Sequence, residues 1–372
     1  MNVNRSVSDV KSELTINGSK DCFIEDIDTN YSLINKRIVK DLCCVDLNIG
    51  RYSKTKIKVL YVSSIADIRL INNICNRLNN INIDAIIDSS YLKNSLEDEN
   101  NLFPTIIETE RPDKSCMALL EGKAIIIVDN SPYVLILPNL FFDFFHTPDD
   151  YYQKAINTSF IRIIRLIAFI ISIFLPGFFI AVTTRNYNLV PINVLLIFKA
   201  GRAFVPFSAF IEAMFMIISF EILKESDLRM SHAASSSISI LGGLILGDAA
   251  VAAGIVSPIM IIIIAISSIA GLIFPSQELV NTIRIYKIIA LIMSSLFGIY
   301  GLIMSFLTLT YNIFDTRIFG YKYLDYDKNE LLDSFFKYNT KIKKRNSHLT
   351  NNKIRGKYKW KEFLLFWFFF LF

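Results

Sequence analysis

One uncharged run decides the fold class of this chain: Leu166-Ile-Ala-Phe-Ile-Ile-Ser-Ile-Phe-Leu-Pro-Gly-Phe-Phe-Ile-Ala-Val-Thr-Thr184. It matches the roughly 18–20 residues with which a helix crosses the ~30 Å hydrocarbon core of a bilayer. Three further uncharged stretches follow, at residues 230–247, 249–277 and 288–314. Together these stretches exclude a soluble enzyme with a single apolar helix, and they predict an α-helical polytopic membrane domain.

The distribution of charge separates this membrane region from both of its flanks. The 372 residues include 39 Lys+Arg and 34 Asp+Glu. Residues 1–160 carry 17 basic and 22 acidic side chains, and residues 161–313 carry nine and six. Residues 314–372 carry 13 and six, so the net positive charge belongs to the C-terminal tail. A basic tail beside a membrane domain favours membrane lipid as a partner, and the acidic N-terminal part argues against nucleic acid.

Residues that could support catalysis or metal binding are few. Five cysteines precede the membrane region without a Cys-x-x-Cys spacing, and the three histidines are His146, His232 and His348. This pattern indicates neither a zinc site nor a disulfide framework. The sequence also lacks a Gly-Lys-Ser phosphate loop and the common hydrolase motifs. We therefore expect no metal, no cofactor and no enzymatic activity.

The block Glu110-Arg-Pro-Asp113 could form a catalytic acid–base cluster. A proline directly after an arginine at the end of a strand is more typical of a rigid turn. We therefore favour a structural turn that carries a salt bridge.

The part before the membrane alternates between strand and helix periodicity. Residues 1–20 are polar and are expected to be disordered. Residues 21–155 are predicted to form a cytoplasmic mixed α/β domain of the α+β class, because no apolar signal core precedes them. The predicted strands are 56–62, 103–108, 123–129 and 133–137, and the predicted helices are 66–80 and 115–120.

We expect four membrane-spanning helices within residues 156–314. They are placed at about 161–182, 204–223, 255–274 and 286–313. The segment Ser237–Ala250 is interrupted by Gly242, Gly243, Gly247 and Asp248, so we interpret it as re-entrant. Six crossings are the alternative, if residues 190–198 also cross with their neighbours.

The predicted even number of crossings rests on the tail, residues 315–372. It carries ten Lys/Arg and no acid between Lys337 and Lys361, which favours the cytoplasmic side, where the head is also expected. The tail ends in a short apolar run, Phe363–Phe372, which is too short as a helix to span a bilayer. We expect this run to be an interfacial anchor or a frameshift scar.

Two acidic residues within the predicted membrane region are candidates for an ion path. Ionisable groups cost about 2.5–3.5 kcal/mol at membrane depth and are therefore turned toward a polar interior. Glu212 shares one helix stripe with Ser208 and Ser219, and Asp248 lies in the glycine-rich segment. The alternative is an interhelical hydrogen bond from Glu212 without a role in transport.

Small residues recur at helical spacing and predict either close helix packing or a pore lining. Backbone of this kind at membrane depth is either buried or lines a watery cavity. The positions are Gly243, Gly247, Gly254, Gly298, Gly301 and Ser305.

Several ordered blocks resemble one family, the A subunits of spore germinant receptors, known as the GerA family. In the head they are Phe23-Ile-Glu-Asp-Ile-Asp-Thr-Asn30, Ile49-Gly-Arg-Tyr-Ser-Lys-Thr55, Thr109-Glu-Arg-Pro-Asp-Lys114 and Val128-Asp-Asn-Ser-Pro-Tyr133. In the membrane region they are Leu175-Pro-Gly-Phe178, Glu221-Ile-Leu-Lys-Glu225, Leu241-Gly-Gly-Leu-Ile-Leu-Gly247 and Ser257-Pro258.

The resemblance implies an A subunit in the spore inner membrane. Such a subunit works with B and C subunits and forms oligomers that release ions when a nutrient binds. Compared with the family pattern, the chain lacks a first N-terminal subdomain and the usual C-terminal tail. Asp248 and Ser231 stand where glutamine and proline are common. The alternatives are a family homologue that assists ion release without being a receptor, and a secondary transporter.

Overall fold

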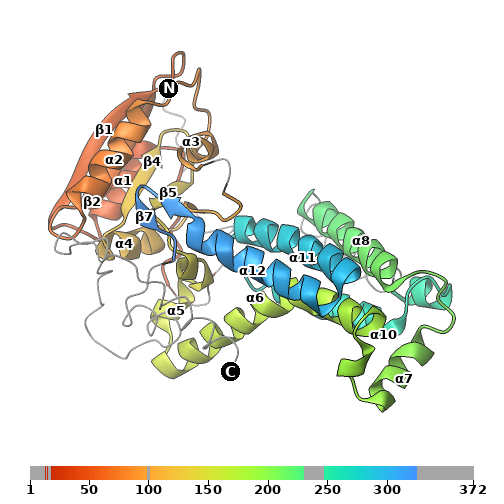
Figure 1. The fold of residues 1–372 in the computed structure, drawn as a ribbon. Helices are drawn as coiled ribbons and strands as arrows, with labels where there is room; N and C mark the ends of the chain where they lie inside the picture. Colours follow the sequence, from red (N-terminus) through yellow and green to blue (C-terminus); the bar gives the residue numbers. More distant parts are fainter. Residues whose placement is uncertain (1–12, 14, 16–17, 99–100, 230–246, 325–372) are drawn as a thin grey trace.

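A computed structural model describes residues 13, 15, 18–98, 101–229 and 247–324, without the side chains of 227–229. An N-terminal head built on a β-sheet is joined to a bundle of helices that extends away from it (Figure 1). This confirms the expected order of a mixed α/β domain followed by a helical domain. Most of the predicted disordered start, most of the predicted re-entrant segment and the tail beyond residue 324 lie outside the described residues.

The head contains a five-stranded sheet in the order β1-β2-β4-β5-β3, with every neighbouring pair antiparallel. The strands are β1 (Leu42–Ile49), β2 (Thr55–Val62), β3 (Ile107–Thr109), β4 (Ala124–Val128) and β5 (Val134–Leu137). Three of the four predicted strands are confirmed. The strand expected at 103–108 begins only at Ile107, because the amides of Thr105 and Ile106 donate to the Glu97 carboxylate instead of to a neighbouring strand.

Helices cover both faces of the sheet. They are α1 (Ile27–Asn35) and α4 (Pro112–Leu120) on one face, and α2 (Ile68–Asn79) and α3 (Ser89–Leu96) on the other. Strand β4 serves both cores, since Ile125 and Ile127 face α1 and α4 while Ile126 and Val128 face α2 and α3. An aspartate caps the N-terminus of each of α1, α2 and α3, which fixes where these helices begin.

The second part of the chain is helical, apart from a final two-stranded ribbon. Its elements are η1 (Phe141–Phe145), α5 (Asp149–Tyr152), α6 (Ala155–Thr184), η2 (Tyr187–Leu189), α7 (Ile192–Gly201), α8 (Ala209–Arg229), α10 (Pro258–Gly271), α11 (Gln277–Phe297), α12 (Ile299–Asp315), β6 (Arg317–Ile318) and β7 (Tyr321–Lys322). By length and composition, α6 and α11 could each cross a membrane, and α7 and α10 are shorter apolar helices.

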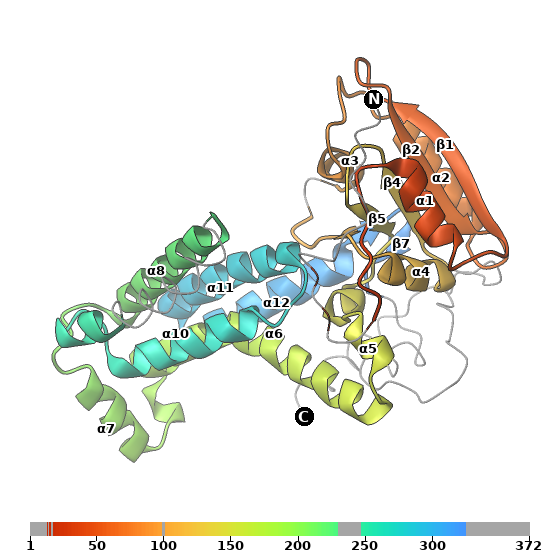
Figure 2. The ribbon, with the colours of Figure 1, turned by 180° about the vertical axis from the view of Figure 1, so that it is seen from behind.

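The bundle begins and ends at the head (Figures 1 and 2). Helix α6 leaves the head, and α12 returns to it. After α12, Ile318 and Phe319 enter the same hydrophobic core as α2 and α3, and the Tyr321 hydroxyl donates to Asp67 at 3.0 Å. Part of the region expected to be a free tail therefore belongs to the head.

The single span expected at residues 286–313 is wrong. The chain reverses at Gly298, and α11 and α12 pack against each other as a helical hairpin (Figure 1). Gly298 has φ +64°, a left-handed conformation that side chains with a Cβ rarely adopt. The segment therefore forms two antiparallel helices where one was expected.

Candidate functional site

An aromatic cluster joins the head to the bundle. Phe103 of the head stacks on Tyr286 of α11, with ring centroids 5.5 Å apart. Phe141 and Phe145 of η1 contact Phe169 of α6 edge-on, at 5.7 and 5.4 Å. These rings belong to one buried core that also contains residues of α10 and α12. A displacement of the head is therefore passed to the helices by direct packing rather than absorbed in a linker.

A buried ion pair fixes the start of α6 beside this cluster. Arg165 donates to both carboxylate oxygens of Asp150, at 2.6 and 3.1 Å, and to the carbonyl of Phe145 at 2.8 Å. Burial opposes ionisation of Asp150, but hydrogen bonds and charge from Arg165 keep the pKa of this carboxyl below its ordinary value. Arg165 therefore holds α6 to the head.

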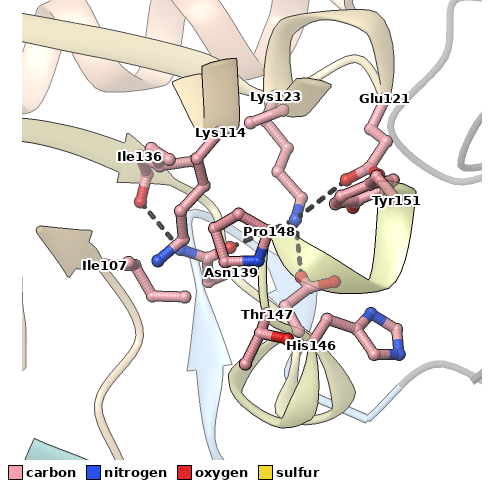
Figure 3. A pocket seen from close by; sticks show the side chains of 12 residues that line it. Ile107, Lys114, Glu121, Lys123, Ile136, Asn139, His146, Thr147, Pro148 and Tyr151 are labelled. Carbon is pink, nitrogen blue, oxygen red and sulfur yellow. Dashed lines mark hydrogen bonds and ion pairs between the residues drawn. The ribbon is translucent and has the colours of Figure 1, made fainter. Parts of the chain in front are cut away.

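A second polar network surrounds Lys123 (Figure 3). Its Nζ atom lies 2.7 Å from Asp143 Oδ2, 3.3 Å from Glu121 Oε2 and 3.1 Å from Asn139 Oδ1. The neighbouring His146 is half-buried, and loss of solvation together with the charge of Arg162 lowers the pKa of His146 to about 4. The imidazole is therefore neutral near pH 7.

A cavity of about 260 Å³ lies between the head and the start of α11. Lys93 of α3 and Glu278 of α11 form an ion pair across it, and Glu108 lines the same space. Burial raises the pKa of the Glu108 carboxyl, although the charge of Lys93 opposes this. The junction thus combines the apolar aromatic cluster with the ion pair of Lys93 and Glu278.

Glu212 lies at the end of the bundle far from the head, and its carboxylate is fully engaged. It is 1% exposed. Arg202, at the end of α7, approaches Oε1 at 2.9 Å, and Ser257 donates its amide and hydroxyl to Oε2 at 3.1 and 3.0 Å. Glu212 therefore ties the end of α7, the start of α8 and the N-cap of α10 together. The sequence analysis missed Arg202 as the partner, although it is the charged residue that precedes Glu212 most closely.

The other proposed ion-path residues are less enclosed. Ser208 is exposed just before α8, Ser219 is half-buried, and Asp248 is exposed. Among the residues that the structure describes, no hydrogen bond or ion pair joins Asp248 to Glu212. Of these four residues, only Glu212 is placed deep in the bundle, and the shared path stays a prediction.

The predicted small residues differ in how tightly they are enclosed. A Cβ atom on Gly301 would collide with the backbone carbonyl of Met293 across the hairpin, and one on Gly254 would lie 3.2 Å from the Phe204 carbonyl. A Cβ on Gly247 would meet no atom of the described residues within 4 Å. Ser305 is buried and donates to the Leu302 carbonyl at 2.8 Å, whereas Gly243 lies outside the described residues.

The block at residues 110–113 forms the rigid start of α4. Pro112 is the first residue of α4, and Arg111 donates to Asp113 at 3.0 and 2.7 Å. Burial opposes the charge of Asp113, but bonds from Arg111 and Tyr152 lower the pKa of its carboxyl. These contacts confirm the rigid turn with its salt bridge. In the described parts of the chain, no group of three or more histidine, cysteine or acidic residues is placed to hold a metal.

Comparison with known proteins identifies relatives along most of the chain. The family model described as Bacillus/Clostridium GerA spore germination protein matches residues 1–348. Spore germination protein KA of Bacillus subtilis is 37% identical over 322 residues, which are 86% of this chain and 59% of that protein. Spore germination protein XA of Bacillus anthracis is 36% identical over 86% of this chain and 65% of its own length.

Two further similarities concern the membrane and the head. The uncharacterized membrane protein YfkQ of Bacillus subtilis is 34% identical over 89% of this chain and 66% of its own length. Among solved structures, the N-terminal domain of the A subunit of the Bacillus megaterium spore germinant receptor GerK3 is 41% identical, with a TM-score of 0.28. That match covers 32% of this chain and 97% of the solved one. The chain spans about three fifths of the relative named first.

Proposed function

The chain belongs to the GerA family of spore germination proteins, and from this we propose that it is the A subunit of a nutrient germinant receptor. Its role is to pass nutrient binding in the receptor to an ion-release step in the membrane. The family model describes a spore germination protein, which supports the expectation that the chain is not an enzyme.

One structural observation carries the coupling role: the head and the bundle share a single core. Phe103 stacks on Tyr286, and Lys93 pairs with Glu278 of the same helix. A receptor subunit whose two parts shared only a linker could not pass strain between them. Here a change of a few ångströms in the head must repack α6 and α11, because a close-packed core does not deform smoothly.

The proposed partners and location follow from the family and from the path of the chain. We propose assembly with B and C subunits, and with further copies of itself, in the spore inner membrane. Since α6 leaves the head and α12 returns to it, the head and the tail belong on one side of the membrane, which we take to be the cytoplasm. With the hairpin counted as two passes, the expected four become five, so head and tail share a side only if one further segment crosses. We therefore propose the six-crossing alternative, in which residues 190–198 also cross with their neighbours.

The ion path is proposed to pass the end of the bundle far from the head. Glu212 orders three segments there, and Asp248 lies beside Gly247 in the sequence before α10. We expect spores with Asp248→Ala or Glu212→Ala, at parental receptor levels, to release potassium more slowly when nutrient is added. Release at the parental rate from both variants contradicts the path.

The receptor assignment is tested in spores of the bacterium that encodes the chain. Deleting the gene should abolish nutrient-triggered potassium release, and restoring it should restore release. The variant Phe103→Ala should retain membrane localisation but release little potassium when nutrient is added. The control Tyr52→Ala, at an exposed position of the head, should release potassium normally. A full nutrient response in the deletion strain contradicts the proposal.

A further inference from the structure

A cluster of charged side chains lies between α8 and α11, away from the sites described above. Arg284 of α11 pairs with Glu221 of α8 at 2.7 Å. Lys224 and Lys287 lie close enough to interact electrostatically with both of them. Three cations therefore face one carboxylate, which leaves a local excess of two positive charges.

This excess has no acceptor among the residues that the structure describes. Lys287 is only 7% exposed, yet its ammonium group forms no hydrogen bond or ion pair with any of them. The Nε atom of Arg284 is also buried without an acceptor. Residues 227–246, whose side chains the structure does not describe, carry one acid, Asp227, and one base, Arg229, so they leave the local charge unchanged. A largely buried lysine beside two other cations is costly, so the site favours an anion.

The cluster lies level with the junction between the head and the bundle. Tyr286, between Arg284 and Lys287 in the sequence, stacks on Phe103 of the head. The membrane surface on the side of the head is expected at this level, because the head lies outside the bilayer. Helix α8 lies along α11 at the outer edge of the described bundle (Figures 1 and 2).

The surface around the cluster is apolar and exposed. Ile218 and Ile222 of α8 are 51% and 60% exposed, and Ile285 of α11 is 41% exposed. Acyl chains would contact these side chains, while a headgroup would lie at the charged cluster. Basic pockets between helices at this depth suit anionic headgroups.

We infer that the crevice formed by Lys224, Arg284 and Lys287 binds the phosphate group of an anionic phospholipid in the leaflet nearest the head. The phosphate supplies the acceptors that Lys287 and Arg284 Nε lack, and it balances the local charge. The apolar rim distinguishes this occupant from a soluble anion. The site is separate from the proposed receptor role and does not depend on it.

The test uses the full-length chain, with any subunits that copurify, in nanodiscs of phosphatidylcholine alone or with about 30% phosphatidylglycerol. Phosphatidylglycerol should raise the thermal midpoint of the parental protein by about 5 °C. Lys287→Met should lose most of this shift, and Lys287→Arg should keep most of it. Lys56→Met, at an exposed position of β2, controls for net charge and should behave like the parent.

The thermal midpoint in phosphatidylcholine alone shows whether the variant Lys287→Met has misfolded or has only lost the lipid site. There, Lys287→Met should be at least as stable as the parent, because the substitution removes an unpaired buried charge. Native mass spectrometry should find phosphatidylglycerol retained by the parent and lost from Lys287→Met. An equal shift in parent and variant overturns the proposal, as does the absence of any shift in the parent. If ~10 mM inorganic phosphate stabilises the detergent-solubilised chain to the same extent, a lipid is not the ligand of the site.

Discussion

The two ends of the bundle hold buried charge in different ways. Next to the head, Asp150 and Lys123 each have several partners within the chain, and they join the helices to a rigid sheet. At the far end, Glu212 gathers three segments, and between these ends Lys287 is largely buried without an acceptor among the described residues. Charged side chains that are paired within the chain stabilise the fold and join the head to the helices. A charge left without an acceptor marks a place where something outside the chain completes the structure.

The largest effect is expected at the junction. Asp150→Ala leaves Arg165 buried and without its carboxylate, which should lower the free energy of unfolding by about 3–5 kcal/mol. Thermal unfolding of the purified chain in neutral detergent measures this loss. Asp84→Ala, which removes an exposed carboxylate from the head, should change little. Equal midpoints for the two variants would show that the junction does not depend on the pair.

A smaller loss is expected at the far end of the bundle. Glu212→Ala removes the acceptor of Arg202 and Ser257, but Arg202 is partly exposed and can reach water, so the cost should be about 2–3 kcal/mol. Glu212→Gln keeps the size of the side chain and one acceptor, and it should recover part of the loss. If the glutamine variant is as unstable as the alanine variant, the negative charge rather than the hydrogen bonds holds the three segments together.

The head was more predictable from the sequence than the bundle, and the reason is periodicity. In β2 and β4 the alternate residues enter two different cores, so strand position and burial could both be inferred. Residues 288–314 are apolar on all sides, so hydropathy could not reveal that the chain turns back at Gly298. The partners of Asp150 and Glu212 were also hidden, because Arg165 and Arg202 reach them only through the tertiary fold.

The third prediction concerns the hairpin of α11 and α12. It tests whether the small residues there allow close helix packing or line an open pore. Gly301→Ala forces a Cβ against the Met293 carbonyl and should destabilise the protein by about 1–2 kcal/mol. Gly247→Ala, where the space is open, should have almost no effect on stability. The same thermal unfolding measurement compares the two. A tolerated Gly301→Ala would mean that α11 and α12 are farther apart than this packing requires.

The smallest effect is expected from His146, at the head side of the junction. Its pKa is about 4 in the folded chain, lowered first by burial and then by the charge of Arg162, against an ordinary value of 6.5. Between pH 6.5 and 4 the unfolded chain therefore binds a proton that the folded chain does not, so stability falls as the pH falls through this range. We expect a loss of about 1–2 kcal/mol from pH 7 to pH 5, measured as a shift of the thermal midpoint.

The variant His146→Gln isolates this contribution from that of the nearby carboxylates. Asp150 and Asp113 have lowered pKa values, so their contributions are lost only as the pH falls below the ordinary value of 3.8. Above pH 5 the variant should therefore show a flatter dependence on pH than the parent. If parent and variant lose equal stability between pH 7 and pH 5, the imidazole is not the group that titrates. The junction would then respond to pH through another side chain.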